Sequence, residues 1–127
     1  MKLSDYVAQK AVEHGVKHVF MVTGGGAMHL NHSFGTHKNL ECIFNHHEQA
    51  CAIGAEAYYR QSNRLPIFNV TSGPGGTNTI TGVYGAWVDS IAMLVIYGQV
   101  KWATTVRSTG LSLRQYGDQE LDIEELV

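Results

Sequence analysis

The sequence has few charged residues, few cysteines and no long apolar run, and each shortage narrows the class of protein. Asp, Glu, Lys and Arg make up 16% of the 127 residues, below the quarter that is typical of globular domains, so we expect part of the surface to meet a partner. Only Cys42 and Cys51 are present, and residues 1–5 lead straight into a helical pattern rather than a signal peptide, which indicates a reducing, cytoplasmic setting. The longest apolar run, residues 91–97, is too short to span a bilayer, so no membrane partner is expected.

The sequence also has no large excess of positive or negative charge. The net charge of −2 gives no electrostatic case for nucleic acid as a partner. Five of the 11 acidic residues fall in the last ten positions, a pattern typical of a solvated face. The length fits one compact domain and excludes a chain that carries both a catalytic and a separate cofactor domain.

The histidines do not form a metal-binding pattern. Five of the seven lie between His29 and His47, but there is no His-Glu-x-x-His, and neither cysteine belongs to a Cys-x-x-Cys pair. We therefore expect no metal site made by this chain alone. Most of these histidines are expected at the surface, while His46 and His47 stand beside Glu48 as candidate polar groups of an active site.

Apolar runs alternate with helical patterns along the chain. Short connections and buried apolar strands of this kind predict an α/β fold, a parallel sheet with helices on both faces. Ser4 is the expected cap of the first helix and Gly15 its end. Strands are predicted at residues 16–22, 40–44, 65–71 and 91–97, and helices at 4–14, 27–34, 46–61 and 77–88.

The segments that follow the strands are the candidate site, because ligands of parallel sheets bind at the carboxyl ends of the strands. These segments are residues 23–28, 45–49, 72–78 and 98–99. The turn at residues 72–76 lacks the Gly-Lys-Ser/Thr ending of a P-loop and does not complete the dinucleotide fingerprint. Either it brings bare backbone N–H groups close to a ligand, or it is only a tight strand-to-helix connection.

Glu48 has two interpretations. Asn45 is a good N-cap, and Glu48 stands three residues later, as in a capping box near a helix N-terminus. Alternatively, Glu48 lies at the end of a strand and before a run of small apolar residues, where a carboxyl group is suited to exchanging a proton. The spacing alone leaves both interpretations open.

Four segments taken together resemble a known family. They are Thr23-Gly24-Gly25-Gly26-Ala27, then His47-Glu48-Gln49 with Ala55-Glu56-Ala57-Tyr58, then Thr71-Ser72-Gly73-Pro74-Gly75 with Thr77-Asn78, and finally Tyr97-Gly98-Gln99. In this order and spacing they resemble the N-terminal pyrimidine-binding domain of thiamine-diphosphate enzymes, and the acetolactate synthase-like group in particular. The resemblance covers nearly the whole chain and implies that residues 1–127 form a single pyrimidine-binding domain.

The resemblance also implies roles for individual residues. In the family a glutamate hydrogen-bonds N1′ of the cofactor's aminopyrimidine, and the match gives this catalytic role to Glu48. A protonated carboxyl at N1′ favours the imino form of the 4′-nitrogen, which then removes the proton at C2 of the thiazolium ring. Gly25 and Gly26 match the loop that approaches the cofactor closely, and Pro74 and Asn78 match positions near the pyrimidine.

Three further residues are implied as substrate contacts. Gln119 resembles a glutamine that reaches the active site in acetolactate synthases, although Asp118 replaces the Phe that precedes it there and so departs from that substrate pocket. His46 and His47 are similar to adjacent histidines that assist proton transfer or bind substrate in some decarboxylases of the family.

One half of the cofactor site has no counterpart in the sequence. The family holds the diphosphate and Mg²⁺ through a Gly-Asp-Gly motif and a later Asn on a second domain, and this chain has neither. We therefore expect Mg²⁺ to be held by a partner domain. The pyrimidine-binding domain normally continues past the position of Val127, so a C-terminally truncated, incomplete domain is expected. FAD, which some acetolactate synthases bind, is allowed by the resemblance but indicated by no residue.

The leading functional hypothesis is the pyrimidine half of a thiamine-diphosphate-dependent 2-keto acid decarboxylase or carboligase. Its partner would be another copy in a homo-oligomer, or a complementary diphosphate-binding domain or subunit. The alternatives are the small subunit of a two-subunit decarboxylase of the sulfopyruvate or phosphonopyruvate type, a nucleotide-binding module built on the turn at residues 73–76, and a non-catalytic α/β interaction domain.

Overall fold

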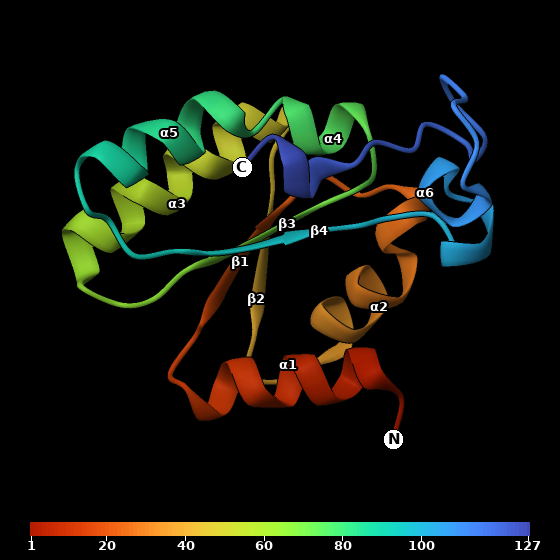
Figure 1. Ribbon diagram of the computed structural model, residues 1–127. Helices are drawn as coiled ribbons and strands as arrows, with labels where there is room; N and C mark the ends of the chain where they lie inside the picture. Colours follow the sequence, from red (N-terminus) through yellow and green to blue (C-terminus); the bar gives the residue numbers. More distant parts are fainter.

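A four-stranded parallel sheet lies between two layers of helices in the computed structural model, which describes residues 1–127 (Figure 1). The strand order is β2-β1-β3-β4, and every neighbouring pair is parallel. The predicted fold class, α/β with a parallel sheet and helices on both faces, is confirmed. The strands are β1 (His18–Met21), β2 (Glu41–Phe44), β3 (Ile67–Val70) and β4 (Leu94–Tyr97).

The helices divide between the two faces of the sheet (Figure 1). Helices α1 (Leu3–Glu13) and α2 (Met28–Thr36) cover one face, and α3 (Glu48–Ser62) and α5 (Ile80–Val88) cover the other. Short helical turns complete the chain: η1 (Gly25–Ala27), α4 (Pro74–Thr77), η2 (Trp102–Thr104), α6 (Val106–Thr109) and η3 (Ile123–Glu125). No helix has the length and apolar content needed to cross a membrane.

The core has two halves because successive strand residues point to opposite faces. On the α1 and α2 side, Val19 and Ile67 are fully buried with Phe34. On the α3 side, Phe68 is buried in a second cluster with the small residues of α3. All four residues of β3 are buried, as expected of a central strand of a parallel sheet.

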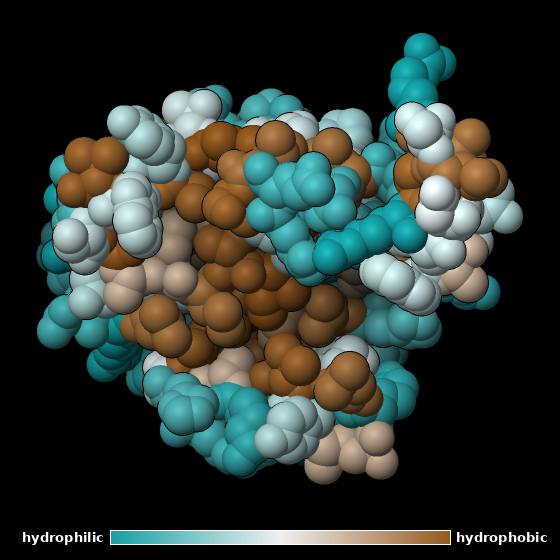
Figure 2. All heavy atoms as spheres, in the orientation of Figure 1, coloured by the Kyte–Doolittle hydropathy of each residue, from teal (hydrophilic) through white to brown (hydrophobic).

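The edge strand β4 is open to solvent on one side. Leu94 is 43% exposed, and the next three residues are only half-buried. Figure 2, which views the molecule from the side of this strand, shows hydrophobic side chains gathered in the middle of the face. The low content of charged residues is therefore visible as an apolar surface on the folded chain.

Two local predictions needed correction. Ser4 does not cap α1: the helix begins at Leu3, and the Ser4 side chain is buried inside it, accepting a hydrogen bond of 2.8 Å from the Ser33 hydroxyl. The helix predicted at residues 77–88 begins later, as α5 at Ile80, and the separate short helix α4 precedes it; the buried Thr79 hydroxyl between them donates to the carbonyl of Gly76. Gly15 has a φ of 81° and follows α1 as predicted.

The contact between α3 and α5 gives a test of the packing. A Cβ at position 82 would lie 2.5 Å from the Cβ of Ala52, both on helix backbones that have little freedom to move. Gly82→Ala should lower the free energy of unfolding by about 1 to 3 kcal/mol, as overpacking does. Gly85→Ala is the matched control, since its new methyl would have its nearest contact at 3.7 Å. Chemical denaturation should show Gly85→Ala unchanged or stabilised, and equal effects of the two variants would contradict this packing.

Candidate active site at the carboxyl ends of the strands

Glu48 and Asn78 come together from two different motifs. Glu48 is the first residue of α3, which follows β2, and Asn78 directly follows α4, which follows β3. The side-chain amide Nδ2 of Asn78 donates a hydrogen bond of 2.9 Å to Oε2 of Glu48. Because the carboxyl ends of parallel strands meet at one edge of the sheet, two segments 30 residues apart can share this contact.

The capping-box interpretation of Glu48 is wrong. The N-cap of α3 is His47, whose backbone is extended with φ −155° and ψ 143°, and whose Nδ1 accepts a hydrogen bond of 3.1 Å from the N–H of Gln49. Asn45 instead accepts a hydrogen bond from the Sγ of Cys51 at 3.5 Å. The cap is thus satisfied by His47, which leaves the Glu48 carboxylate free to reach Asn78.

Bare backbone lies beside this carboxylate. Gly73 has a φ of 54° and turns the chain into α4, whose first residue is Pro74, exposed at the surface. A Cβ at position 75 would lie 2.8 Å from Cγ2 of Thr71 and 3.8 Å from Oε1 of Glu48. The turn therefore brings the backbone of Gly75 close to the Glu48 carboxylate. A side chain at position 75 would collide with Thr71.

The glycine loop, defined as residues 24–26, lies against the same point. The N–H of Gly26 donates a hydrogen bond of 3.0 Å to Oγ1 of Thr71. A Cβ at position 24 would collide with the Thr71 side chain, and a Cβ at position 26 would meet Oγ of Ser72 at 3.0 Å. Only Gly25 has open space around its Cβ direction and is exposed. Both glycine-rich segments thus pack on Thr71.

Sequence reasoning did not single out Thr71. A signal for it exists, because Thr71 is the last residue before the turn and the first after a fully buried strand. A hydroxyl at that point can accept a backbone hydrogen bond from a neighbouring loop.

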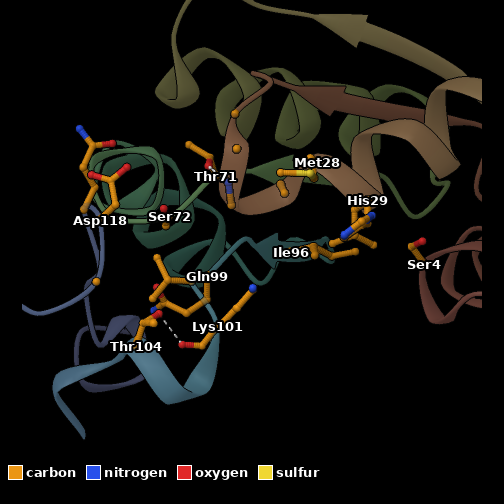
Figure 3. A pocket seen from close by; sticks show the side chains of 18 of the residues that line it. Ser4, Met28, His29, Thr71, Ser72, Ile96, Gln99, Lys101, Thr104 and Asp118 are labelled. Carbon is orange, nitrogen blue, oxygen red and sulfur yellow. Dashed lines mark hydrogen bonds between the residues drawn. The ribbon is translucent and has the colours of Figure 1, made fainter. Parts of the chain in front are cut away.

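A large groove is next to this site but is not lined by Glu48 (Figure 3). It has a volume of about 1440 Å³ and runs from α1 past the glycine loop to the C-terminal segment. Gly25, Gly26 and Gln119 line it, whereas Glu48, Pro74 and Asn78 do not. The glycine loop and Thr71 line the groove, and Gly75, whose Cβ direction points at both Thr71 and Glu48, connects them to the paired Glu48 and Asn78.

The backbone of Gln119 contacts the turn that begins at Gly73. It has a φ of 51°, and its carbonyl oxygen packs on Gly73, where any Cβ would collide with it. The next residue, Glu120, holds this segment through three backbone N–H donors, those of Val106, Tyr116 and Gly117, at 2.7 to 2.8 Å. The structure therefore brings the Gln119 backbone into contact with the turn at residues 72–76.

Two histidines precede Glu48 in the chain, and a cysteine follows it. His46 is exposed, and His47 serves as the helix cap. Burial, with a smaller effect of the negative charge of Glu48, raises the pKa of the Cys51 thiol to about 12, so it is not a nucleophile. No three His, Cys, Asp or Glu side chains lie together as metal ligands would.

Comparison with known protein families identifies the domain. The family model described as "Thiamine pyrophosphate enzyme, N-terminal TPP binding domain" matches residues 1–126. The chain belongs to this family. Thiamine pyrophosphate is the same cofactor as thiamine diphosphate, so the resemblance seen in the sequence motifs is confirmed at the level of the family.

The similar members of the thiamine pyrophosphate enzymes include acetolactate synthases. The acetolactate synthase large subunit of Buchnera aphidicola is 38% identical over 97 residues, which are 76% of this chain and 17% of that protein. The large subunit of Lactococcus lactis is 37% identical over 97 residues, with the same coverage. The chloroplastic acetolactate synthase of Arabidopsis thaliana is 33% identical over 99 residues, 78% of this chain and 15% of that protein. The matched region therefore spans about a sixth of these relatives.

Three backbone N–H groups donate to the Glu120 carboxylate, and we call this arrangement the Glu120 clasp. It predicts that the C-terminal segment responds to pH. Partial desolvation acts to raise the pKa of the Glu120 carboxyl, but the N–H donors of Gly117, Val106 and Tyr116 outweigh it and hold the pKa below its ordinary value of 4.5. Because the folded pKa is the lower one, the ionised carboxylate stabilises the segment above the unfolded pKa, and this contribution is lost as the pH falls through the folded pKa.

The amide proton shifts of these three donors, followed by NMR against pH, should titrate together with a midpoint below 4.5. Glu120→Gln should remove the shared titration. A midpoint at or above the ordinary value, or a shared titration that persists in Glu120→Gln, would contradict the clasp.

Proposed function

We propose that this domain supplies the pyrimidine-binding half of a thiamine pyrophosphate site in a 2-keto acid decarboxylase or carboligase, with Glu48 as its catalytic acid. The observation that carries the proposal is the hydrogen bond from Asn78 to Glu48. It joins two of the four motifs that carry the resemblance, at the edge of the sheet where ligands of parallel sheets bind. The similarity to acetolactate synthases supports 2-keto acids such as pyruvate as the substrate class.

The residues present fit an aminopyrimidine ring. A flat heteroaromatic ring needs close approach of backbone without side chains, which the open Cβ direction of Gly25 allows, while Gly26 and Gly75 let the two loops pack tightly on Thr71 and Ser72. It also needs a hydrogen-bonding carboxyl group at the ring edge, and Glu48 stands beside Gly75. When bound, thiamine pyrophosphate supplies the electron sink for decarboxylation of a 2-keto acid.

The chain's own residues then hold and move one proton. With the cofactor bound, the Glu48 carboxyl group would exchange a proton with the ring nitrogen N1′, as a general acid does. The Asn78 amide, by occupying Oε2 of Glu48, fixes the rotation of the carboxyl group and leaves Oε1 on the side of Gly75. Pro74 sets the start of α4 and so the position of this turn. Gln119, His46 and His47 are proposed to contact the substrate, as the resemblance implies.

The diphosphate half of the site is proposed to come from a partner. Helices α3 and α5 begin beside Glu48 and Asn78, and α5 exposes large aromatic side chains: Tyr84 is 68% exposed and Trp87 81% exposed. Aromatic side chains of this kind are typical of protein interfaces. A diphosphate-binding domain, from a second copy or a complementary subunit, would cover this face, bring Mg²⁺ and close the cofactor site. The two-subunit arrangement of sulfopyruvate-type decarboxylases is one form of this assembly.

Replacing Glu48 tests the proposed function. In the enzyme assembled with its diphosphate-binding partner, Glu48→Gln should lower the rate of thiamine pyrophosphate-dependent pyruvate decarboxylation by on the order of 10² to 10⁴, since a glutamine cannot give its proton to N1′. The measurement is the release of CO₂ at saturating cofactor.

Glu56→Gln is the matched control, because Glu56 lies on the same helix, where it pairs with Arg60 away from the site. This control should keep the activity of the unchanged enzyme. Near-full activity of Glu48→Gln would overturn the assignment of the catalytic acid.

A further inference from the structure

Two asparagine side chains connect the central strand to the glycine loop. Asn69 in β3 is fully buried, and its Nδ2 donates a hydrogen bond of 2.7 Å to Oδ1 of Asn31 in α2. Asn31 in turn donates from Nδ2 to the carbonyl of Gly24 at 3.3 Å. The chain of bonds therefore runs from the middle of the sheet, through α2, to the backbone of the glycine loop.

This arrangement is costly for the core. Oδ1 of Asn69 is buried and has no hydrogen-bond partner, and an unpaired buried polar atom costs about 1 to 3 kcal/mol. Asn69 and Ile67 lie on the same face of the sheet, and Ile67 is apolar and fully buried. An apolar side chain at position 69 would leave no unpaired polar atom in the core. Stability alone therefore does not explain an asparagine at this position.

The bonds to the glycine loop hold it from two sides. The carbonyl of Gly24 is held by Asn31, and the N–H of Gly26 is held by Thr71, which Figure 3 shows at the wall of the groove. Gly25 between them has no atom within 4 Å of its Cβ direction. The loop is thus fixed at both ends and open at its centre.

We propose that Asn69 and Asn31 are positioning residues that set the height of the glycine loop above the end of β3, and so present the Gly25 backbone to the cofactor. This inference rests on the proposed function, because it takes thiamine pyrophosphate as the ligand of the loop. The two asparagines act through Gly24 and touch no ligand themselves. The alternative is that the pair only ties α2 to the sheet.

Two variants separate these roles. Asn31→Asp keeps the size of the side chain and the acceptor for Asn69, but replaces the donor to Gly24 with a second acceptor. The double variant Asn31→Leu/Asn69→Leu removes both polar groups, a change that is often neutral for stability or stabilising. Thermal unfolding of both variants shows whether the fold is kept.

The first measurement is amide hydrogen exchange in the assembled enzyme without cofactor. Both variants should exchange faster in the segment of residues 24–27, by on the order of tenfold, the factor that one lost hydrogen bond gives. Exchange in α5, on the opposite face of the sheet, should be unchanged. Unchanged exchange of the loop in both variants would overturn the positioning role.

The second measurement is the Kd of thiamine pyrophosphate, titrated into the same samples. Both variants should bind more weakly, while the double variant keeps or gains thermal stability. Loss of stability with an unchanged Kd would show that the pair only ties α2 to the sheet, and would overturn the proposal. Absence of cofactor binding by the unchanged enzyme would contradict the proposed function, and that result is distinct because the exchange measurement uses no cofactor.

Discussion

Thr71, at the end of the central strand, is the point on which the rest of the site depends. The glycine loop donates a hydrogen bond to its hydroxyl through Gly26, and the backbone of Gly75 packs on its methyl group. Glycine is required on both sides of Thr71, because a Cβ at position 24 or 75 would overlap its side chain. The geometry follows from topology: β1 and β3 are adjacent and parallel, so the loops that follow them leave the sheet at the same edge.

The two polar residues of the site, Glu48 and Asn78, are positioned by the helices on the α3 and α5 side of the sheet. Glu48 begins α3 and Asn78 precedes α5, and these two helices pack closely because Gly82 lets the backbone of α5 approach Ala52. The distance between Glu48 and Asn78 is therefore set by helix packing and not by flexible loops. Helix α5 exposes Tyr84 and Trp87, so the proposed catalytic acid lies at the margin of the surface where a partner domain is proposed to bind.

The sequence predicted the alternation of strands and helices and the segments at the carboxyl ends of the strands, because these depend on local apolar runs and on glycine. It did not predict contacts between distant residues. His47 replaces Asn45 as the cap of α3, since the chain stays extended up to position 47. The late start of α5, at Ile80, and the separate short helix α4 before it were also not predicted. The link between Asn69 and Asn31 spans 38 positions and leaves no local pattern. Gln119 was found through family resemblance, as its segment has no periodicity of its own.

The central claim is that Glu48 and Asn78 act as one unit on the cofactor, and a double-mutant cycle tests it most directly. The Kd of thiamine pyrophosphate would be measured in the assembled enzyme for Glu48→Ala, for Asn78→Ala and for the variant with both changes. If Asn78 works by orienting the Glu48 carboxyl, Asn78→Ala weakens binding in the unchanged enzyme but adds little once Glu48 is removed. Losses of binding free energy that simply add would show that the two residues act independently and would contradict the account.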